Sequence, residues 1–161
     1  MQSFEDLQFC RQVRGSRMGC RLLSCQGRMH SFEDLECYRL ARELRMAISR
    51  VCKALPPEEE HRLKGQILRS SRSVAANIAE GFGRHSHQEN LQFCRQARGS
   101  LAETLEHLNC ALDEGFISKE GYDNLRAATE QAWKVLNGYI AYLQRCRQSG
   151  VPTRKPDNPT T

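Results

Sequence analysis

Residues 63–84 read LKGQILRSSRSVAANIAEGFGR, and their apolar side chains recur every three or four positions. At this spacing Ile67, Val74 and Ile78 fall on one side of a helix, with Ser70 among them. The acidic residues 58–60 come just before the stretch and suit the positive end of a helix. Glycines follow at positions 81 and 83, and we expect them to stop the helix. The stretch therefore predicts an amphipathic helix with one buried side.

Three further segments of the chain show the same helical period, one before this stretch and two after it. Each is bounded by residues that cap or end helices. The predicted caps and stops are Ser31 with Asp34, the prolines at 56–57, Ser86 with Glu89, Gly115, and Ser118.

Four amphipathic helices of similar length with short joins predict an all-α fold, an up-down-up-down four-helix bundle over residues 31–148. The apolar stripes of the four helices should meet in one core. The residues expected to be buried there are Leu44, Ile48, Ile67, Val74, Ile78, Leu101, Leu105, Leu108, Leu136 and Leu143.

The chain repeats parts of itself at its amino terminus. Residues 3–7 recur at 31–35, and residues 7–16 recur at 91–100 with Val13 in place of Ala97. A tandem repeat would keep one offset, whereas these pieces have two. We therefore interpret residues 1–30 as an irregular extension, a partial echo of the domain that lies outside its fold. Residues 149–161 are polar and rich in proline, and we expect a disordered tail there.

Composition narrows the class of protein. The 161 residues are 39% hydrophobic and 27% charged, with a formal net charge of +5. No run resembles a signal peptide or a membrane span, so we expect a cytoplasmic protein without a membrane partner.

The sequence offers no residues for catalysis, a metal or a cofactor. The eight cysteines are irregularly spaced and form no CxxC, which favours reduced thiols. His85 and His87 form an HxH pair at a helix junction, but no second pair stands at metal-site spacing. Residues 81–83, Gly-Phe-Gly, lack the lysine of a phosphate-binding loop. We therefore predict a protein that is not an enzyme and holds no metal or cofactor.

Basic residues are concentrated between positions 61 and 99, where seven lysines and arginines face only Glu80 and Glu89. Such a surplus either binds anions or is an ordinary solvated surface. Arg98 borders the core stripe of its helix, and we expect it to pair with Glu80. The candidate nucleic-acid-binding residues are Arg62, Arg69, Arg72, Arg84 and Arg95.

Small side chains suggest a surface where another backbone could approach. Gly65, Ser73 and Ala76 lie roughly opposite the predicted core side of their helix, and we predict that they form an interface between copies of the chain. Gly99, in the middle of a helix, predicts a close contact or a bend. The alternative is that these small residues are merely tolerated.

Two motifs carry a resemblance to a known family: SVAANIAEGFGR at residues 73–84 and ARGSLAE at residues 97–103. They resemble a bacterial four-helix bundle family first noticed as proteins encoded in intervening sequences of large-subunit ribosomal RNA. The resemblance covers residues 31–148 and leaves residues 1–30 without a counterpart. The family is similar to the accessory variability protein of diversity-generating retroelements, a basic bundle that forms a pentamer, binds nucleic acid and accompanies a reverse transcriptase.

The resemblance implies a homopentamer that binds RNA or DNA, with a reverse transcriptase or another protein as a further partner. We therefore expect a non-enzymatic, oligomeric protein that binds nucleic acid or acts as an accessory scaffold without reading base sequence. The alternative is a protein interaction module that binds no nucleic acid.

Overall fold

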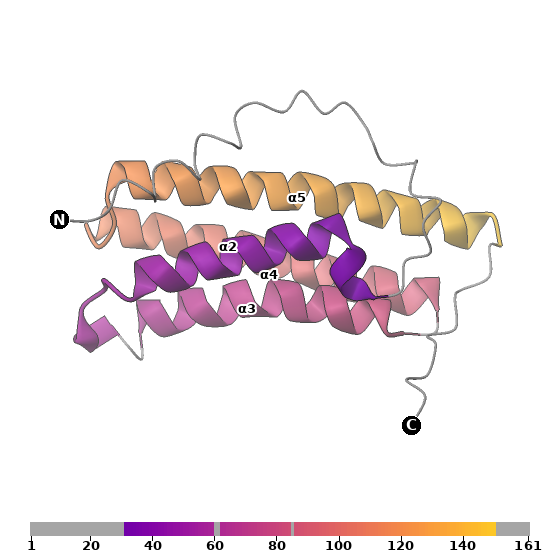
Figure 1. The fold of residues 1–161 in the computed structure, drawn as a ribbon, viewed down its shortest axis with the longest axis horizontal. Helices are drawn as coiled ribbons and strands as arrows, with labels where there is room; N and C mark the ends of the chain where they lie inside the picture. The colour runs from indigo at the N-terminus through magenta and orange to yellow at the C-terminus, as the bar shows by residue number, and fades with distance from the viewer. Residues whose placement is uncertain (1–30, 60–61, 85, 151–161) are drawn as a thin grey trace.

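The structure is a computed structural model, and it describes residues 31–59, 62–84 and 86–150. Within these residues, two 3-10 turns, η1 (Phe32–Asp34) and η2 (Pro57–Glu59), accompany four helices. The helices are α2 (Glu36–Cys52), α3 (Leu63–Phe82), α4 (His87–Asp113) and α5 (Lys119–Gln148). They run antiparallel as a four-helix bundle (Figure 1), which confirms the predicted fold class. The predicted extension and nearly all of the predicted tail lie outside the described residues.

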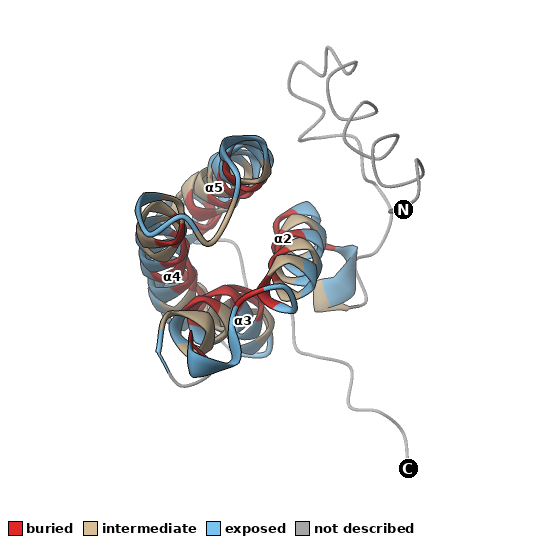
Figure 2. Ribbon diagram, turned by 90° about the vertical axis from the view of Figure 1, so that its left-hand side faces the viewer, coloured by how far each residue is buried: buried red, intermediate tan, exposed pale blue. Residues whose placement is uncertain are grey.

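Each helix packs against two neighbours, in the order α2, α3, α4 and α5 around the bundle (Figure 2). Their buried sides meet in a single hydrophobic cluster, as the apolar stripes predicted. Nine of the ten predicted core residues are buried; the exception is Leu105, which is only half-buried. The buried side of α4 includes Thr104, which is 0% exposed, in its place.

Hydroxyl groups make a threonine acceptable at that buried position. The Thr104 hydroxyl lies 2.7 Å from the Ser100 carbonyl oxygen, to which it donates, and 3.0 Å from the Ser70 hydroxyl. One turn away, the Ser100 hydroxyl lies 3.1 Å from the Ser73 hydroxyl. Small polar side chains with satisfied hydrogen bonds therefore join α3 to α4 over about one turn.

Three of the predicted caps and stops act differently from expectation. The prolines at 56–57 do not end α2, which ends four residues earlier at Cys52. Ser31 and Asp34 form a capping box around the short turn η1, whereas α2 begins only at Glu36. Gly81 does not stop α3, since it is buried inside the helix. A Cβ added to Gly81 would lie 2.9 Å from the Phe93 Cβ and 3.2 Å from the backbone oxygen of Asn90. Gly81 is therefore a point of close approach between α3 and α4.

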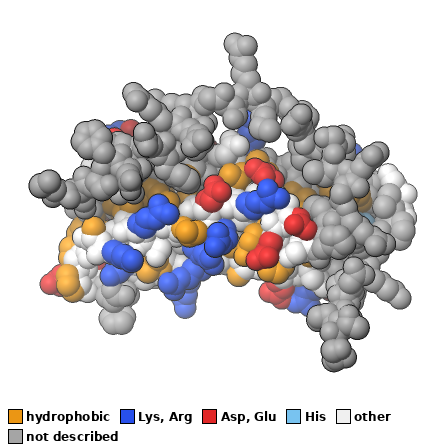
Figure 3. Space-filling model, viewed as in Figure 1, with side chains coloured by type: hydrophobic (Ala, Val, Ile, Leu, Met, Phe, Trp, Pro, Cys, Tyr) orange, Lys and Arg blue, Asp and Glu red, His pale blue; other side chains and the backbone are white. Residues whose placement is uncertain are grey.

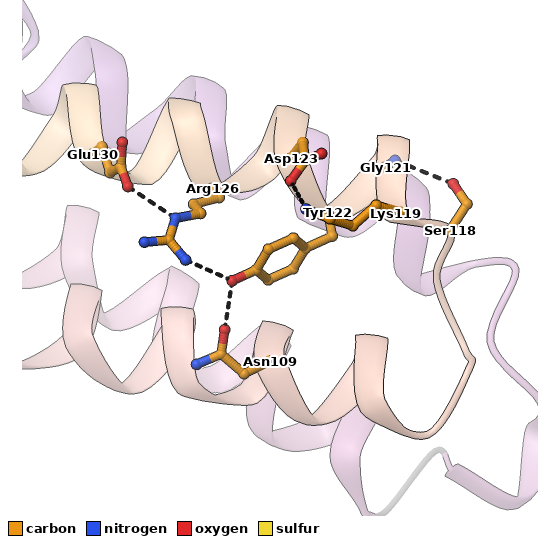
Figure 4. Close-up of polar contacts among 8 residues, drawn as sticks. All are labelled: Asn109, Ser118, Lys119, Gly121, Tyr122, Asp123, Arg126 and Glu130. Carbon is orange, nitrogen blue, oxygen red and sulfur yellow. Dashed lines mark hydrogen bonds and ion pairs between the residues drawn. The ribbon is translucent and has the colours of Figure 1, made fainter.

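Contacts in the turn between α4 and α5, and in the first turn of α5, hold the two helices together. Gly115 ends α4 with a φ of 74°, as predicted, and Ser118 caps α5 by accepting a hydrogen bond from the Gly121 amide. The Tyr122 hydroxyl donates to Asn109 of α4 at 2.7 Å and accepts from Arg126 at 3.0 Å (Figure 4). These contacts hold the two helices in register.

Candidate nucleic-acid interface

The five predicted nucleic-acid-binding arginines do not form one cluster. Arg62 lies at the start of α3, Arg69 and Arg72 lie in its middle, and Arg84 follows its end. Since a helix rises about 1.5 Å per residue, Arg62 and Arg84 are roughly 30 Å apart. Arg95 is on α4, which flanks α3 on the side away from α2 (Figure 2).

Three of the five arginines, Arg69, Arg72 and Arg95, are free to bind an anion among the described residues, and the first two lie together in the middle of α3. Arg69 and Arg72 are exposed and one turn apart. Among the described residues, neither guanidinium forms a hydrogen bond or an ion pair. Arg62 is also open to solvent, with a side chain 78% exposed and 3.9 Å from the Glu59 carboxylate.

Arg84 is occupied by contacts within its own subunit. It pairs with Glu80, and its Cζ lies 4.8 Å from the centre of the Phe93 ring. The predicted pairing of Arg98 with Glu80 is therefore wrong, because Glu80 pairs with Arg84, four residues further along the chain. Arg98 is exposed and donates to the Asn137 side chain at 3.5 Å.

A groove of about 550 Å³ opens between α2 and α3. It contains two arginines, Arg45 from α2 and Arg72 from α3, and no acidic residue of the described chain lines it. In Figure 3, lysine and arginine side chains spread over this face of the bundle, with apolar and some acidic side chains between them. The groove can therefore hold an anion beside an apolar surface.

Arg45 is a site residue that the sequence reasoning missed. It is half-buried beside the groove, and among the described residues it has no hydrogen bond or ion pair. The signal was present in the sequence, since α2 carries four arginines and two glutamates. The count of basic residues began at position 61 and so left α2 out.

The three residues predicted to form an oligomer interface do not share one surface. Ala76 is exposed and lines the same groove as Arg72, and Gly65 is half-buried. Ser73 instead faces α4, where its hydroxyl meets that of Ser100. Because α3 packs against both α2 and α4, the buried part of its surface is wide. Ser73 therefore contacts α4 even though it lies far from the middle of that buried surface. At Gly99 a Cβ would meet nothing within 4 Å, so no close contact in the described chain explains this glycine.

Five cysteines lie within or at the end of described helices, and all are free thiols. Four are buried, as expected for small apolar side chains, and Cys110 is half-buried. Burial raises the pKa of both Cys37 and Cys94 to about 12. At neutral pH these two thiols are protonated and cannot act as nucleophiles.

The raised pKa values predict that alkali destabilises the fold. Above the ordinary thiol pKa near 9.0, the unfolded chain releases protons that the folded chain keeps on Cys37 and Cys94. Stability is therefore full below pH 9 and falls as the pH rises toward 12, by roughly 1 kcal/mol for each thiol between pH 8 and 10. Urea unfolding at the two pH values measures the loss. Cys94→Ala should remove the share of one thiol, and an unchanged loss in that variant would contradict the assignment.

The described residues contain no group of three histidine, cysteine or acidic side chains that could hold a metal ion. His85 of the HxH pair lies outside the described residues. None of the described helices is both long and apolar enough to cross a membrane.

Comparison with known proteins gives a matching family and solved structures of similar fold. The family model for the 23S rRNA-intervening sequence protein matches residues 33–138. A crystal structure of a protein of unknown function from the S23 ribosomal protein family of Bacteroides thetaiotaomicron superposes with a TM-score of 0.61 at 25% identity. The match covers 65% of this chain and 97% of that chain. No curated protein matches the chain.

Proposed function

Because the chain belongs to the 23S rRNA-intervening sequence protein family, we propose that it is a non-enzymatic, oligomeric protein that binds nucleic acid through phosphates without reading base sequence. Neither the family nor the solved relative is described as an enzyme. The resemblance to the retroelement accessory protein adds RNA or DNA, and a reverse transcriptase or another protein, as the partners to test.

The observation that carries this proposal is the set of free arginines around the groove between α2 and α3. Arg45 and Arg72 line the groove, Arg69 lies one turn from Arg72, and none of the acidic residues that the structure describes lines the groove. Arginine binds phosphate strongly because its planar guanidinium offers several donors. Such contacts fix a nucleic acid in place and carry no base information.

An oligomer would multiply this modest site. One subunit offers only a few phosphate contacts, so a single site is weak. Several copies on one assembly would bind one nucleic acid together and gain avidity without any new contact. The homopentamer implied by the resemblance would present five such grooves, and we propose that binding depends on this repetition.

Removing Arg69 and Arg72 together should weaken binding and flatten its salt dependence. Each arginine that neutralises a duplex phosphate contributes about −0.9 to the slope of log affinity against log salt concentration. Fluorescence anisotropy of labelled single- and double-stranded oligonucleotides between about 50 and 200 mM salt measures both quantities. The parent protein should bind oligonucleotides of different base sequence equally.

The matched control for this test is a second double variant on α5. Lys134→Ala with Arg145→Ala also removes two exposed cations, but from outside the groove. Equal losses in both double variants would show that net charge alone drives binding. No binding by the parent at the lowest salt would favour the alternative, a protein interaction module.

One observation favours that alternative. Met46 is 39% exposed beside the groove, and a large exposed apolar side chain suits a protein partner. Light scattering of the purified protein with and without a short RNA separates the two functions. An oligomer whose mass does not change on adding RNA would support the interaction module.

A further inference from the structure

The groove between α2 and α3 combines arginines with an aromatic and apolar wall. Phe32 and Tyr38 lie against it, with ring centres 4.8 Å apart in an edge-to-face arrangement. Met46 from α2 and Ala76 from α3 add apolar surface that remains open to solvent. Its volume of about 550 Å³ lies within the range of small-ligand sites, about 300–1,000 Å³.

A ligand suited to this groove needs an anionic part and a flat apolar part. Arg45 and Arg72 lack counterions among the described residues, so an anion placed between α2 and α3 would neutralise them. The aromatic and apolar side chains beside them would be covered by a ring. A nucleotide has both parts: its phosphate is an anion and its base is a flat ring.

The base must be unpaired for this contact. In a duplex each base is stacked between its neighbours and shows the protein only its edge, whereas a single strand can place a base face on an aromatic side chain. Stacking tolerates any base, which agrees with binding that does not read sequence.

We propose that the groove lined by Tyr38, Arg45, Met46, Arg72 and Ala76 is a binding site for single-stranded nucleic acid, in which Arg45 and Arg72 hold phosphate while an unpaired base stacks on the apolar wall. The inference rests on the proposed function and adds the class of substrate. An apolar face of a second copy would suit the groove less well, because it would bury the two guanidinium groups without a counter-charge.

Filling the groove tests the stacking separately from the charge. Ala76→Phe places a ring in the groove and leaves both arginines, while Ala127→Phe makes the same change at an exposed position on α5, outside the groove. Losing one stacked base weakens binding about fivefold or more. We therefore expect Ala76→Phe to bind a single strand about fivefold more weakly than the parent and to bind a duplex of equal length as tightly as the parent. Ala127→Phe should bind both as tightly as the parent. The parent should bind an abasic single strand about fivefold more weakly than the intact one.

Cross-linking locates the base in the unaltered protein. A single strand carrying 5-iodouracil, irradiated in complex with the full chain, should attach to tryptic peptides 29–39 or 46–50, which contain Tyr38 and Met46. Attachment confined to other peptides, such as those with Trp133 or Tyr142, would overturn the site.

The remaining outcomes separate this inference from the proposed function. The stacking site is wrong, and phosphate binding stands, if the parent binds nucleic acid and Ala76→Phe has the same affinities as the parent. The same holds if Ala76→Phe loses affinity for single strand and duplex equally. If Ala76→Phe instead lowers the mass of the assembly in light scattering, the groove is a contact between copies. If no nucleic acid binds the parent at low salt, the proposed function itself fails.

Discussion

Leu101→Ala should lower the free energy of unfolding by about 2–5 kcal/mol, because it removes a fully buried side chain and leaves a cavity. Leu101 is 0% exposed and belongs to the central cluster that all four helices share. The backbone around it is held by α3 on one side and α5 on the other, so the cavity cannot close by a simple shift. Urea unfolding followed by circular dichroism measures the loss, and the native spectrum should show helix.

Leu105→Ala is the matched control for this prediction. It makes the same substitution one turn further along α4, at a side chain that is only half-buried. Less apolar area returns to water there, so the loss should be less than half of that at Leu101. Equal losses would show that the buried side of α4 contains Leu105, in place of Thr104.

The sequence alone predicted the number and order of the helices because the signals for both are local. Capping residues such as Ser86 and Ser118 satisfy backbone donors of their own helix, and they do so here as expected. Apolar spacing likewise reports on one helix at a time. Such signals can therefore be recognised in the sequence even when the neighbouring helices are unknown.

What the sequence could not supply depends on contacts between helices. Thr104 is polar, and its burial makes sense only beside the Ser70 hydroxyl of α3, which lies 34 positions earlier. The sequence pattern predicted that Gly81 ends the helix, because the local sequence does not show that α4 packs closely against this position. The burial of Leu105 and the role of Gly81 were therefore predicted wrongly, while Leu101 and Leu108 are buried as predicted.

The candidate site shows the same limit. Arg69 and Arg72 could be predicted as free cations from a local surplus of charge, and the structure leaves them without partners among the described residues. Arg45 comes from another helix and joins Arg72 only because α2 packs against α3. Arg84 was predicted to be free, yet it meets Phe93 across the turn into α4. A site between two helices depends on how they pack, and the distribution of charge along the sequence does not show that packing.

Gly81→Ala and Gly99→Ala should change stability in opposite directions, although both replace a helical glycine with alanine. Alanine favours a helix by about 1 kcal/mol over glycine, so Gly99→Ala should stabilise the protein by up to that amount, since its Cβ meets nothing within 4 Å. At Gly81 the new Cβ would lie 2.8 Å from the Asn90 side-chain oxygen and 3.2 Å from the Asn90 backbone oxygen. The backbone of α4 cannot yield as a flexible side chain can, so α3 and α4 must separate.

That separation also disturbs the interior beyond the glycine. The Asn90 amide donates to the Tyr139 hydroxyl of α5 at 3.1 Å and accepts from the Cys94 thiol at 3.3 Å. Crowding a packed interior costs about 1–3 kcal/mol, which exceeds the gain in helix propensity. We therefore expect the free energy of unfolding of Gly81→Ala to be about 1–3 kcal/mol lower than that of Gly99→Ala, as measured by urea unfolding. If both variants were stabilised, the close approach of α3 and α4 at Gly81 would be wrong, and with it the reason that the motif of residues 73–84 carries a glycine at that position.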